Sequence, residues 1–441
     1  MTISRRDLLL GASGLAAAGT LVNPGDVLAQ AAGGAAPKYT PEPGATLRLL
    51  RWAPFVKGDD ETWLANTKKF SDATGVQVRV DKESWEDIRP KAAVAANVGS
   101  GPDLMLVWFD DPFQYPEKLL DLTDIGTDLG NRFGGWYEGP KGYGTTKDGK
   151  FIALPLATIG NGLVWRQSVI EKAGFKEMPT ETKGFLELCQ ALAKNNLPRA
   201  GFALGNAVGD GNNFAHWILW SHGGQLVDES GKVTINSPET IAGLRYAREL
   251  YQTFIQGTEG WLDINNNRAW LAGEVGVTAN GVSIYYSTRN EPRFKEIADD
   301  TRSSILPVGP VGKPIELHQT TSAIVFRHTK FPNAARAYLQ FMFDKPQMDA
   351  WITGSSAYCC PTLKALIDNP VWNADPVHKP YARASETLRP NGYAGPLGFS
   401  SAATMADYVV VNMVAEAATG QRTPEEAAKR AETRANRVYR V

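Results

Sequence analysis

Two short segments place aromatic and polar side chains directly after predicted strands, where a bound solute would meet them. Trp52 and Phe55 follow an alternating, apolar-rich strand over 46–52, and Asp110 follows the apolar run LMLVW, which ends in Trp108. An aromatic ring can pack against C–H groups, and a carboxylate can accept hydrogen bonds from hydroxyl groups. These residue types are therefore suited to binding a small polar solute.

The elements around these residues are predicted to alternate between strand and helix. Residues 60–74 have helical spacing and stop at Gly75, residues 76–80 alternate as a strand, and 88–97 is an alanine-rich helix. Strands joined by helices in this way form a parallel sheet with right-handed crossovers. Ligands of such sheets bind beyond the carboxyl ends of the strands, which is where Trp52 and Trp108 are expected.

The remainder of the chain continues this alternation, so the predicted class is α/β. No internal repeat is visible. Further strands are predicted at 151–157, 163–166, 202–204, 275–278, 304–306 and 322–326. Further helices are predicted at 168–173, 182–194, 214–222, 238–254, 332–343, 346–352, 407–418 and 424–437.

Motifs for catalysis and for cofactors are absent from the sequence. It has no GxSxG elbow, HExxH helix, CxxC pair or dinucleotide fingerprint. The glycine-containing segment 144–150 is followed by Phe151, where a phosphate-binding loop needs Ser or Thr, and it precedes a strand. The five histidines are scattered. We therefore expect a binding protein without catalysis, cofactor or metal.

The first 31 residues have the features of an export signal. Arg5 and Arg6 precede an apolar run, and Ala29-Gln30-Ala31 provides a small-x-small cleavage site. Paired arginines at this place are typical of the twin-arginine pathway. No cysteine follows the apolar run, so a lipid anchor is not expected. We predict a signal peptide over 1–31, a linker over 32–45 and a soluble periplasmic protein.

Composition limits the partners and the architecture. The net charge is −1, with Lys and Arg spread along the chain, so neither nucleic acid nor an anionic membrane is an implied partner. About 410 residues after the leader are too many for one ordinary core, which favours two lobes. Cys359 and Cys360 are adjacent and cannot easily pair with one another. A bridge from Cys189 to either is possible, although free buried thiols are favoured.

Several motifs, in order along the chain, resemble those of family 1 extracellular solute-binding proteins of ABC importers, the maltose-binding-like group. They run from about residue 46 to 437, and each is loose by itself, whereas their order and spacing are specific. The matching segments are FSDATGVQV (70–78), GSGPDL (99–104), GKFIALP (149–155), WSHGG (220–224), GKVTINSP (231–238), and AATG (417–420) with PEEA (424–427).

The resemblance implies a two-lobed periplasmic binding protein, with a mostly parallel sheet flanked by helices in each lobe and a ligand cleft between the lobes. The chain would cross between lobes near Pro155, His318 and Ser355. Lobe 1 would contain 46–154 and 318–354, and lobe 2 would contain 155–317 and 355–441. A monomer that closes over its solute by hinge bending and then meets a membrane permease is expected.

The resemblance also extends the set of candidate ligand-binding residues into the second lobe. Asn280 and Gly281 fall in the family's loop after the strand 275–278, and Trp217 lies on the aromatic helix 214–222. Where the family often has a tryptophan after the Asn-Gly turn, this chain has Val and Ser, with tyrosines slightly later. The complete predicted set is Trp52, Phe55, Trp108, Asp110, Asn213, Trp217, Asn280, Gly281 and Tyr285.

This mixture of groups favours a sugar or a sugar-like polyol. Trp52, Trp108 and Trp217 could pack against the C–H face of a sugar ring. Asp110, Asn213 and Asn280 could bind its hydroxyl groups, with the cost of unpaired buried hydroxyls rejecting the wrong epimer. The sequence does not identify which sugar.

Two other functions remain open. Tyr285 and Tyr286 resemble the vicinal tyrosine pair of periplasmic ferric-iron binders, and hard cations favour such oxygen ligands. A secreted glycoside-acting enzyme would need two carboxylates about 5–10 Å apart on the cleft. The chain is longer and richer in tryptophan than such iron binders.

Overall fold

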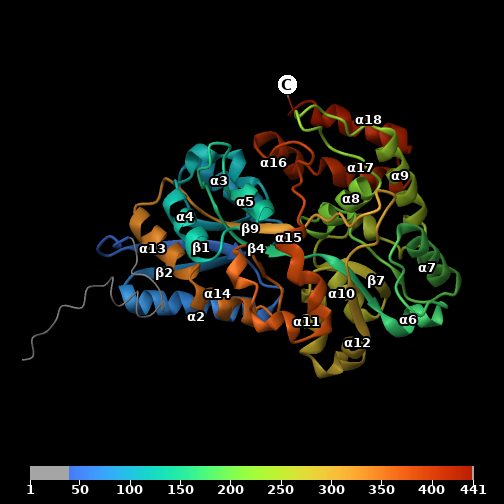
Figure 1. Ribbon diagram of the computed structural model, residues 1–441, viewed down its shortest axis with the longest axis horizontal. Helices are drawn as coiled ribbons and strands as arrows, with labels where there is room; N and C mark the ends of the chain where they lie inside the picture. Colours follow the sequence, from blue (N-terminus) through green and yellow to red (C-terminus); the bar gives the residue numbers. More distant parts are fainter. Residues whose placement is uncertain (1–38, 440–441) are drawn as a thin grey trace, which may run out of the picture.

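The strands form two mixed sheets in the computed structural model, which describes residues 39–439. One sheet has six strands in the order β10-β4-β9-β3-β1-β2, and the other has four in the order β6-β7-β5-β8. Figure 1 shows them in two lobes that lie side by side, each covered by helices. The first sheet contains β1 (Thr46–Trp52), β2 (Gln77–Glu83), β3 (Leu104–Trp108), β4 (Leu154–Ile159), β9 (Gln319–Val325) and β10 (Cys360–Pro361). The second contains β5 (Gly162–Arg166), β6 (Arg199–Ala200), β7 (Val275–Asn280) and β8 (Thr301–Ser304).

The predicted crossovers at the start of the chain are confirmed. β1 pairs parallel with both β2 and β3, and α2 (Lys57–Thr74) and α3 (Ile88–Val98) make the connections. Both helices end where a glycine takes the left-handed conformation, with φ of 76° at Gly75 and 69° at Gly99. Glycine adopts this conformation without the steric cost of a Cβ atom, so it terminates these helices well.

The expectation of mostly parallel sheets was wrong for both lobes. β9 runs antiparallel between β3 and β4, and β10 pairs antiparallel with β4. In the second sheet the β6–β7 pair is parallel, whereas β5 is antiparallel to both β7 and β8. The physical reason is that strands such as β9 re-enter a sheet from the other lobe and are not joined to their neighbours by helical crossovers. The α/β class and the two-lobed architecture agree with the sequence-based expectation.

Two of the expected crossings between the lobes lie at other residues, as the strands of each sheet show. Leu154–Ile159 belongs to the first sheet and Gly162 begins the second, so the chain crosses between these strands and not at Pro155. The second expected crossing, near His318, directly precedes β9. The third crossing lies beyond Ser355, because β10 still belongs to the first sheet.

The end of the expected linker is attached to the first lobe. The Glu42 carboxylate accepts hydrogen bonds from the backbone N–H groups of Asn333 (2.8 Å) and Ala334 (2.9 Å). These groups lie in the first turn of α13 (Pro332–Met342), where a helix has unpaired N–H donors and favours negative charge. Residues 1–38, with the predicted signal peptide, lie outside the described residues.

Helices cover both faces of the first sheet and surround the second (Figure 1). Every residue of α8 (Asp210–Ser221) in the second lobe is buried, as expected of a helix that other helices enclose. Besides α2, α3 and α13, the first lobe has the helices α4 (Thr123–Arg132), α5 (Glu138–Gly144) and α14 (Lys345–Gly354). The helices α15 (Ala384–Thr387) and α16 (Phe399–Ala406) lie between the lobes. The second lobe has α6 (Gln167–Lys172), α7 (Thr182–Lys194), α8 (Asp210–Ser221), α9 (Pro238–Tyr251), α10 (Asn265–Ala272), α11 (Ser283–Arg289), α12 (Lys295–Asp300), α17 (Val409–Ala418) and α18 (Pro424–Ala435).

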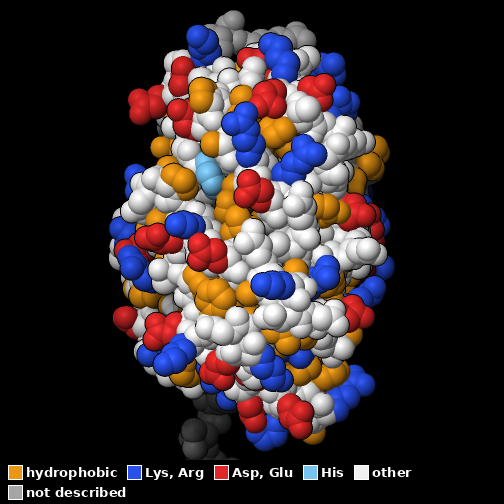
Figure 2. Space-filling model, turned by 90° about the vertical axis from the view of Figure 1, so that its right-hand side faces the viewer, with side chains coloured by type: hydrophobic (Ala, Val, Ile, Leu, Met, Phe, Trp, Pro, Cys, Tyr) orange, Lys and Arg blue, Asp and Glu red, His pale blue; other side chains and the backbone are white. Residues whose placement is uncertain are grey.

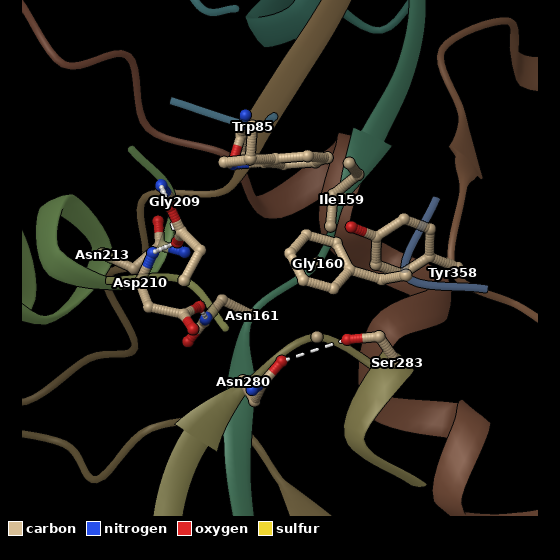
Figure 3. Close-up of a pocket in the computed structure, with 14 residues that line it drawn as sticks. Trp85, Ile159, Gly160, Asn161, Gly209, Asp210, Asn213, Asn280, Ser283 and Tyr358 are labelled. Carbon is tan, nitrogen blue, oxygen red and sulfur yellow. Dashed lines mark hydrogen bonds between the residues drawn. The ribbon is translucent and has the colours of Figure 1, made fainter. Parts of the chain in front are cut away.

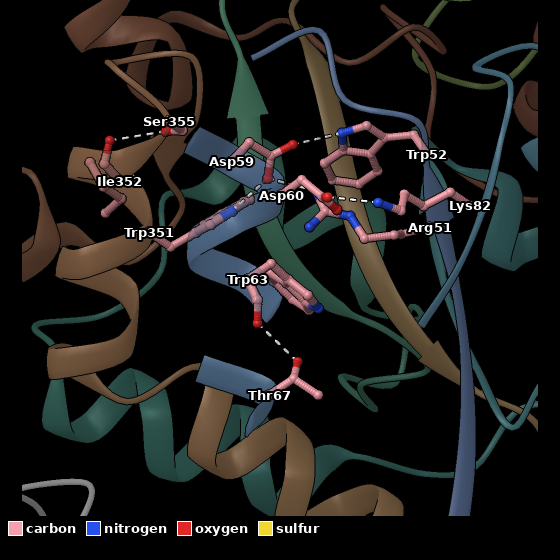
Figure 4. Close-up of polar contacts among 10 residues, drawn as sticks. All are labelled: Arg51, Trp52, Asp59, Asp60, Trp63, Thr67, Lys82, Trp351, Ile352 and Ser355. Carbon is pink, nitrogen blue, oxygen red and sulfur yellow. Dashed lines mark hydrogen bonds and ion pairs between the residues drawn. The ribbon is translucent and has the colours of Figure 1, made fainter. Parts of the chain in front are cut away.

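A buried carboxylate at the start of α2 ties late parts of the chain to the first lobe. Asp59 accepts hydrogen bonds from Arg51 (2.5 Å), from the Trp52 indole (3.0 Å) and from the Trp351 indole (2.7 Å). Figure 4 shows these three side chains converging on it. Since Trp351 lies on α14, this cluster joins β1, α2 and α14 into one unit.

The three cysteines are free and buried, so Cys189 does not pair with Cys359 or Cys360. Among residues 39–439, no helix has the length and apolar character needed to cross a bilayer. On the face drawn in Figure 2, acidic and basic side chains are interspersed, as expected from a net charge of −1.

Candidate functional site

A cavity lies between the two lobes, with walls from both (Figure 3). Its empty volume is about 330 Å³. The connection between β4 and β5 runs along it, through Ile159, Gly160 and Asn161. The other residues that line it are Phe55, Trp85, Gln319 and Tyr358 on the side of the first lobe, and Gly209, Asp210, Asn213, Asp263, Asn280, Gly281 and Ser283 on the side of the second.

Element ends place the polar side chains at this cavity. β7 ends at Asn280 and β9 begins at Gln319. α8 begins at Asp210, so Asn213 lies one turn into the helix and on the same face. Loops and element ends are the usual position of binding residues in α/β folds, because the sheets hold them rigidly.

Four polar atoms of cavity-lining side chains lack a hydrogen-bond partner within the described residues. They are Asn161 Oδ1, Asn213 Oδ1, Gln319 Nε2 and Trp85 Nε1, and their residues are 2–5% exposed. A buried polar group without a partner costs about 1–3 kcal/mol. Both acceptors and donors are therefore available to a polar ligand.

Two buried carboxyl groups, Asp210 and Asp263, lie on the second-lobe wall. Asp263 accepts hydrogen bonds from the backbone N–H groups of Gly209 (3.0 Å) and Asp210 (2.7 Å) at the start of α8, and burial raises its pKa to about 6. Burial and the charge of Asp263 raise the pKa of Asp210 well above its ordinary value. The residues that line this cavity include no Lys, Arg or His.

The Asp210 carboxylate is held by two amides. It accepts hydrogen bonds from Asn161 Nδ2 (2.8 Å) and Asn266 Nδ2 (2.7 Å). Because both donors are neutral, they orient the carboxylate without compensating its charge.

The aromatic wall is formed by Trp85, which directly follows β2 and which the sequence analysis did not select. Its ring contacts Phe55 and Trp108, with centroid separations of 5.2 and 4.1 Å. The strand-end rule that selected Trp52 also applies to Trp85, since β2 ends at Glu83. Because the strand was expected to end at residue 80, Trp85 did not count as a residue at a strand end.

Trp52 and Trp108 lie behind Trp85 and do not line the cavity. Both are fully buried, and the Trp108 indole donates a hydrogen bond to the backbone carbonyl of Trp85 (3.0 Å). Trp52 packs on the other two rings, at 5.2 Å from Trp108 and 5.8 Å from Trp85. They therefore support the ring that faces the cavity.

Three further predicted residues also lie away from the cavity, whereas Phe55, Asn213, Asn280 and Gly281 line it. Asp110 is buried and accepts hydrogen bonds from Ser401 (2.5 Å) and Asn391 (3.0 Å). The Trp217 indole donates to the carbonyl of Pro307 (2.9 Å) within the core of the second lobe.

Tyr285, the third of these residues, is engaged elsewhere. Its hydroxyl donates to Asp375 (2.8 Å), and burial together with that carboxylate raises its pKa to about 12. A phenol in this state is a poor metal ligand. Among residues 39–439, no three His, Cys, Asp or Glu side chains are grouped so that they could hold a metal ion.

The two lobes approach closely beside the cavity. A Cβ atom placed on Gly209 of the second lobe would lie 2.7 Å from Gln319 Oε1 of the first. One on Gly281 would lie 3.4 Å from a ring carbon of Tyr358. The first distance is shorter than a normal contact, so glycine at position 209 permits this approach, whereas the second is an ordinary van der Waals contact.

The comparisons with known proteins agree with this architecture. Residues 65–380 match the family model described as bacterial extracellular solute-binding protein. A solved structure titled maltose-bound MalE3 from T. maritima superposes with a TM-score of 0.78 and 19% identity, covering 89% of this chain and 99% of the other. This likeness shows the same fold.

Curated relatives are more distant in sequence. A putative ABC transporter periplasmic-binding protein, YcjN, from Escherichia coli K12 is 23% identical over 311 residues, which is 69% of each chain. A putative binding protein from Brucella abortus is 22% identical over 287 residues, or 62% of this chain, and the match spans 65% of that relative's length. The family model covers well over half of the chain, and this protein therefore belongs to the family of bacterial extracellular solute-binding proteins.

Proposed function

We propose that this protein is the periplasmic receptor of an ABC importer, and that it binds a small polyhydroxylated solute, a sugar or polyol, in the cavity between the lobes. The observation that carries the proposal is the set of unpartnered polar atoms on Asn161, Asn213, Gln319 and Trp85 around a cavity with an aromatic wall. Hydroxyl groups both donate and accept, so they can satisfy amide oxygens and N–H groups together.

The aromatic ring favours a solute with an apolar C–H face. The Trp85 ring offers an apolar face to the C–H groups of a sugar, and Trp108 behind it limits its movement. A sugar or a polyol has such a face between its hydroxyl groups.

Delivery to a permease is supported by the family and by the name of the Escherichia coli relative. Closure of the lobes over the solute would give the permease a surface that exists only in the loaded receptor. No catalytic step is part of this proposal.

Export through the twin-arginine pathway is proposed from Arg5 and Arg6. Replacing both by lysine should leave the protein in the cytoplasm, because the pathway reads the arginine pair as an address. Fractionation of cells that express the full chain measures this. Undiminished periplasmic protein from the double variant would contradict the proposed route.

The function is tested by a thermal-shift screen of sugars and polyols, followed by calorimetry on the solutes that raise the melting temperature. Asn213→Leu removes Oδ1, an acceptor without a partner in the described residues, so apo stability should hold while the affinity falls by about tenfold or more. Asn195→Leu, the same change at an exposed position of the same lobe, is the control.

If the Asn213→Leu variant binds the solute as tightly as the wild type, binding in this cavity is contradicted. A panel in which no sugar or polyol binds would contradict the proposed function itself. New reducing ends from incubated oligosaccharides would indicate an enzyme.

A further inference from the structure

The second-lobe wall of the cavity presents hydrogen-bond acceptors in excess. In Figure 3, Asn161, Asp210 and Asn213 lie together on one side of the cavity, across from Trp85. Asn161 Oδ1 and Asn213 Oδ1 have no partner among the described residues, and Asp210 contributes a carboxylate. We call these three residues the acceptor cluster.

The orientation of the Asn161 amide is fixed by its neighbour. Its Nδ2 atom donates to Asp210 Oδ1 at 2.8 Å. The remaining amide atom, Oδ1, is therefore an acceptor. The side chain is 4% exposed, so bulk water has little access to it.

Among the described residues, the cavity carboxyl groups have no cationic partner, in contrast to the buried Asp59 and Asp111. Asp59 is paired with Arg51 (2.5 Å), and Asp111 is paired with Arg89 (2.6 Å). Asp210 and Asp263 receive hydrogen bonds from amides and backbone N–H groups, which are neutral. A buried charge without a counter-charge is costly, so a ligand that supplies the missing cation would be bound strongly.

We propose that the solute carries a protonated amino group on its polyhydroxylated frame, as an amino sugar or amino polyol does, and that this group binds the acceptor cluster. The inference rests on the proposed function of the cavity and names its substrate class. An ammonium group brings three donors and no lone pair, which matches the three members of the cluster. A hydroxyl group would turn its own lone pairs toward some of these acceptors.

The aromatic rings of the cavity are compatible with a cation. Phe55, Trp85 and Tyr358 line it, and a ring face attracts a positive charge within about 6 Å. A carboxylate or phosphate group on the solute would instead face two buried acidic side chains. Uronic acids and sugar phosphates should therefore be rejected.

The test compares matched solutes that differ in one group. For each of several monosaccharides and polyols, the amine, the parent alcohol, the N-acetylated amide and, where it exists, the uronate are titrated calorimetrically. For at least one frame, the amine should bind about tenfold more tightly than the alcohol and the amide, a difference of about 1.4 kcal/mol. Uronates should show no binding.

Asp210→Asn connects this preference to the acceptor cluster. It removes the charge with little change in shape, so it should weaken amine binding by about tenfold or more and alcohol binding by less than about threefold. Glu229→Gln removes the same charge from an exposed position of the same lobe and should change neither affinity. If Asp210→Asn does not fold, Asn213→Leu takes its place and should also reduce the amine preference.

Each other outcome overturns the inference in a recognisable way. Alcohols or amides that bind as tightly as the amines would contradict an amine substrate and leave the proposed function intact. If Asp210→Asn weakens binding of the amine and of the alcohol equally, Asp210 accepts from hydroxyl groups only and does not recognise an ammonium group. Failure of every amine, alcohol and amide to bind would contradict the proposed function as well.

Discussion

Trp85 and Trp108 lie in contact but are expected to have separate effects when each is removed. Trp85 lines the cavity, and Trp108 is fully buried against it. Trp85→Ala should weaken solute binding by about 2–4 kcal/mol, the range of an aromatic anchor. Trp108→Ala should lower the free energy of unfolding by about 3–5 kcal/mol, as for a buried aromatic residue.

Urea denaturation without ligand and calorimetry with the best solute, measured on both variants, distinguish these roles. The two variants serve as controls for one another, because they remove the same side chain from adjacent positions. A stable Trp108→Ala protein that has lost its affinity would place Trp108 in the site and contradict the arrangement described above.

Asp110 is expected to give the stability of the protein a measurable pH dependence. Burial raises its pKa from 3.8 to about 6, so the folded state binds this proton more tightly than the unfolded state does. Its contribution to stability is therefore greatest below pH 4 and is lost as the pH rises from about 4 to about 6. Asp110→Asn can still accept a hydrogen bond from Ser401 and has no charge to bury.

The variant should gain stability relative to the wild type between pH 4 and pH 7.5, measured by urea denaturation at each pH. Burial lowers the pKa of His216 to about 4, which gives a pH dependence of opposite sign. That effect is common to both proteins and cancels in their difference. A difference that is constant with pH would contradict the raised pKa of Asp110.

Part of the site could be predicted one residue at a time. Phe55 follows a predicted strand, and Asn280 and Gly281 end another, so local patterns and the family resemblance located them. Asp263 could not be found in this way, because it meets the start of α8 only after the second lobe has folded. Tryptophan identity alone does not distinguish a ring that lines the cavity, such as Trp85, from one behind it, such as Trp108.

At the scale of elements, Asp59 is expected to hold α14 against α2 and β1. It is fully buried and binds Arg51, Trp52 and Trp351. Asp59→Ala would leave the Arg51 charge buried without a partner, which costs about 3–5 kcal/mol of stability.

Asp60→Ala is the matched control, since its partner Lys82 is partly exposed, and an exposed ion pair contributes about 0–1 kcal/mol. Denaturant unfolding of both variants measures the difference. Equal and small effects would show that the Asp59 cluster contributes little.

The order of strands and helices could be predicted well, but the direction of the strands could not. Alternation and helical spacing located β1, α2 and α3 because these signals are local. The antiparallel position of β9 between β3 and β4 depends on where a strand returns after more than a hundred residues in the second lobe. No local pattern records that return. The strand predicted at 202–204 likewise lies earlier in the chain, at β6.

At the scale of the whole molecule, the cavity has walls from both lobes and is therefore complete only when they are together. A solute that contacts both walls stabilises the closed arrangement by its differential affinity for it. At 100 times its dissociation constant, the linked stabilisation is about 2.7 kcal/mol. Gly209, where the lobes touch, permits this approach.

Gly209→Ala should therefore impair closure. Its Cβ atom would come within 2.7 Å of Gln319 Oε1, across the contact between lobes. We expect weaker solute binding with little change in apo stability, measured by calorimetry and by thermal unfolding. Gly231→Ala, at an open turn of the second lobe, tests a glycine replacement away from the cavity, although its φ of 89° adds local strain. Unchanged affinity in Gly209→Ala would argue against close contact in the loaded state.

Closure of the two lobes over a solute is measured by small-angle scattering of the protein with and without a saturating solute. The loaded protein should have a smaller radius of gyration than the free protein, because a solute that contacts both walls favours the closed lobes. Saturation is verified by calorimetry on the same sample. Identical scattering profiles, with a solute that binds and raises the melting temperature, would contradict a receptor that closes two lobes over its ligand.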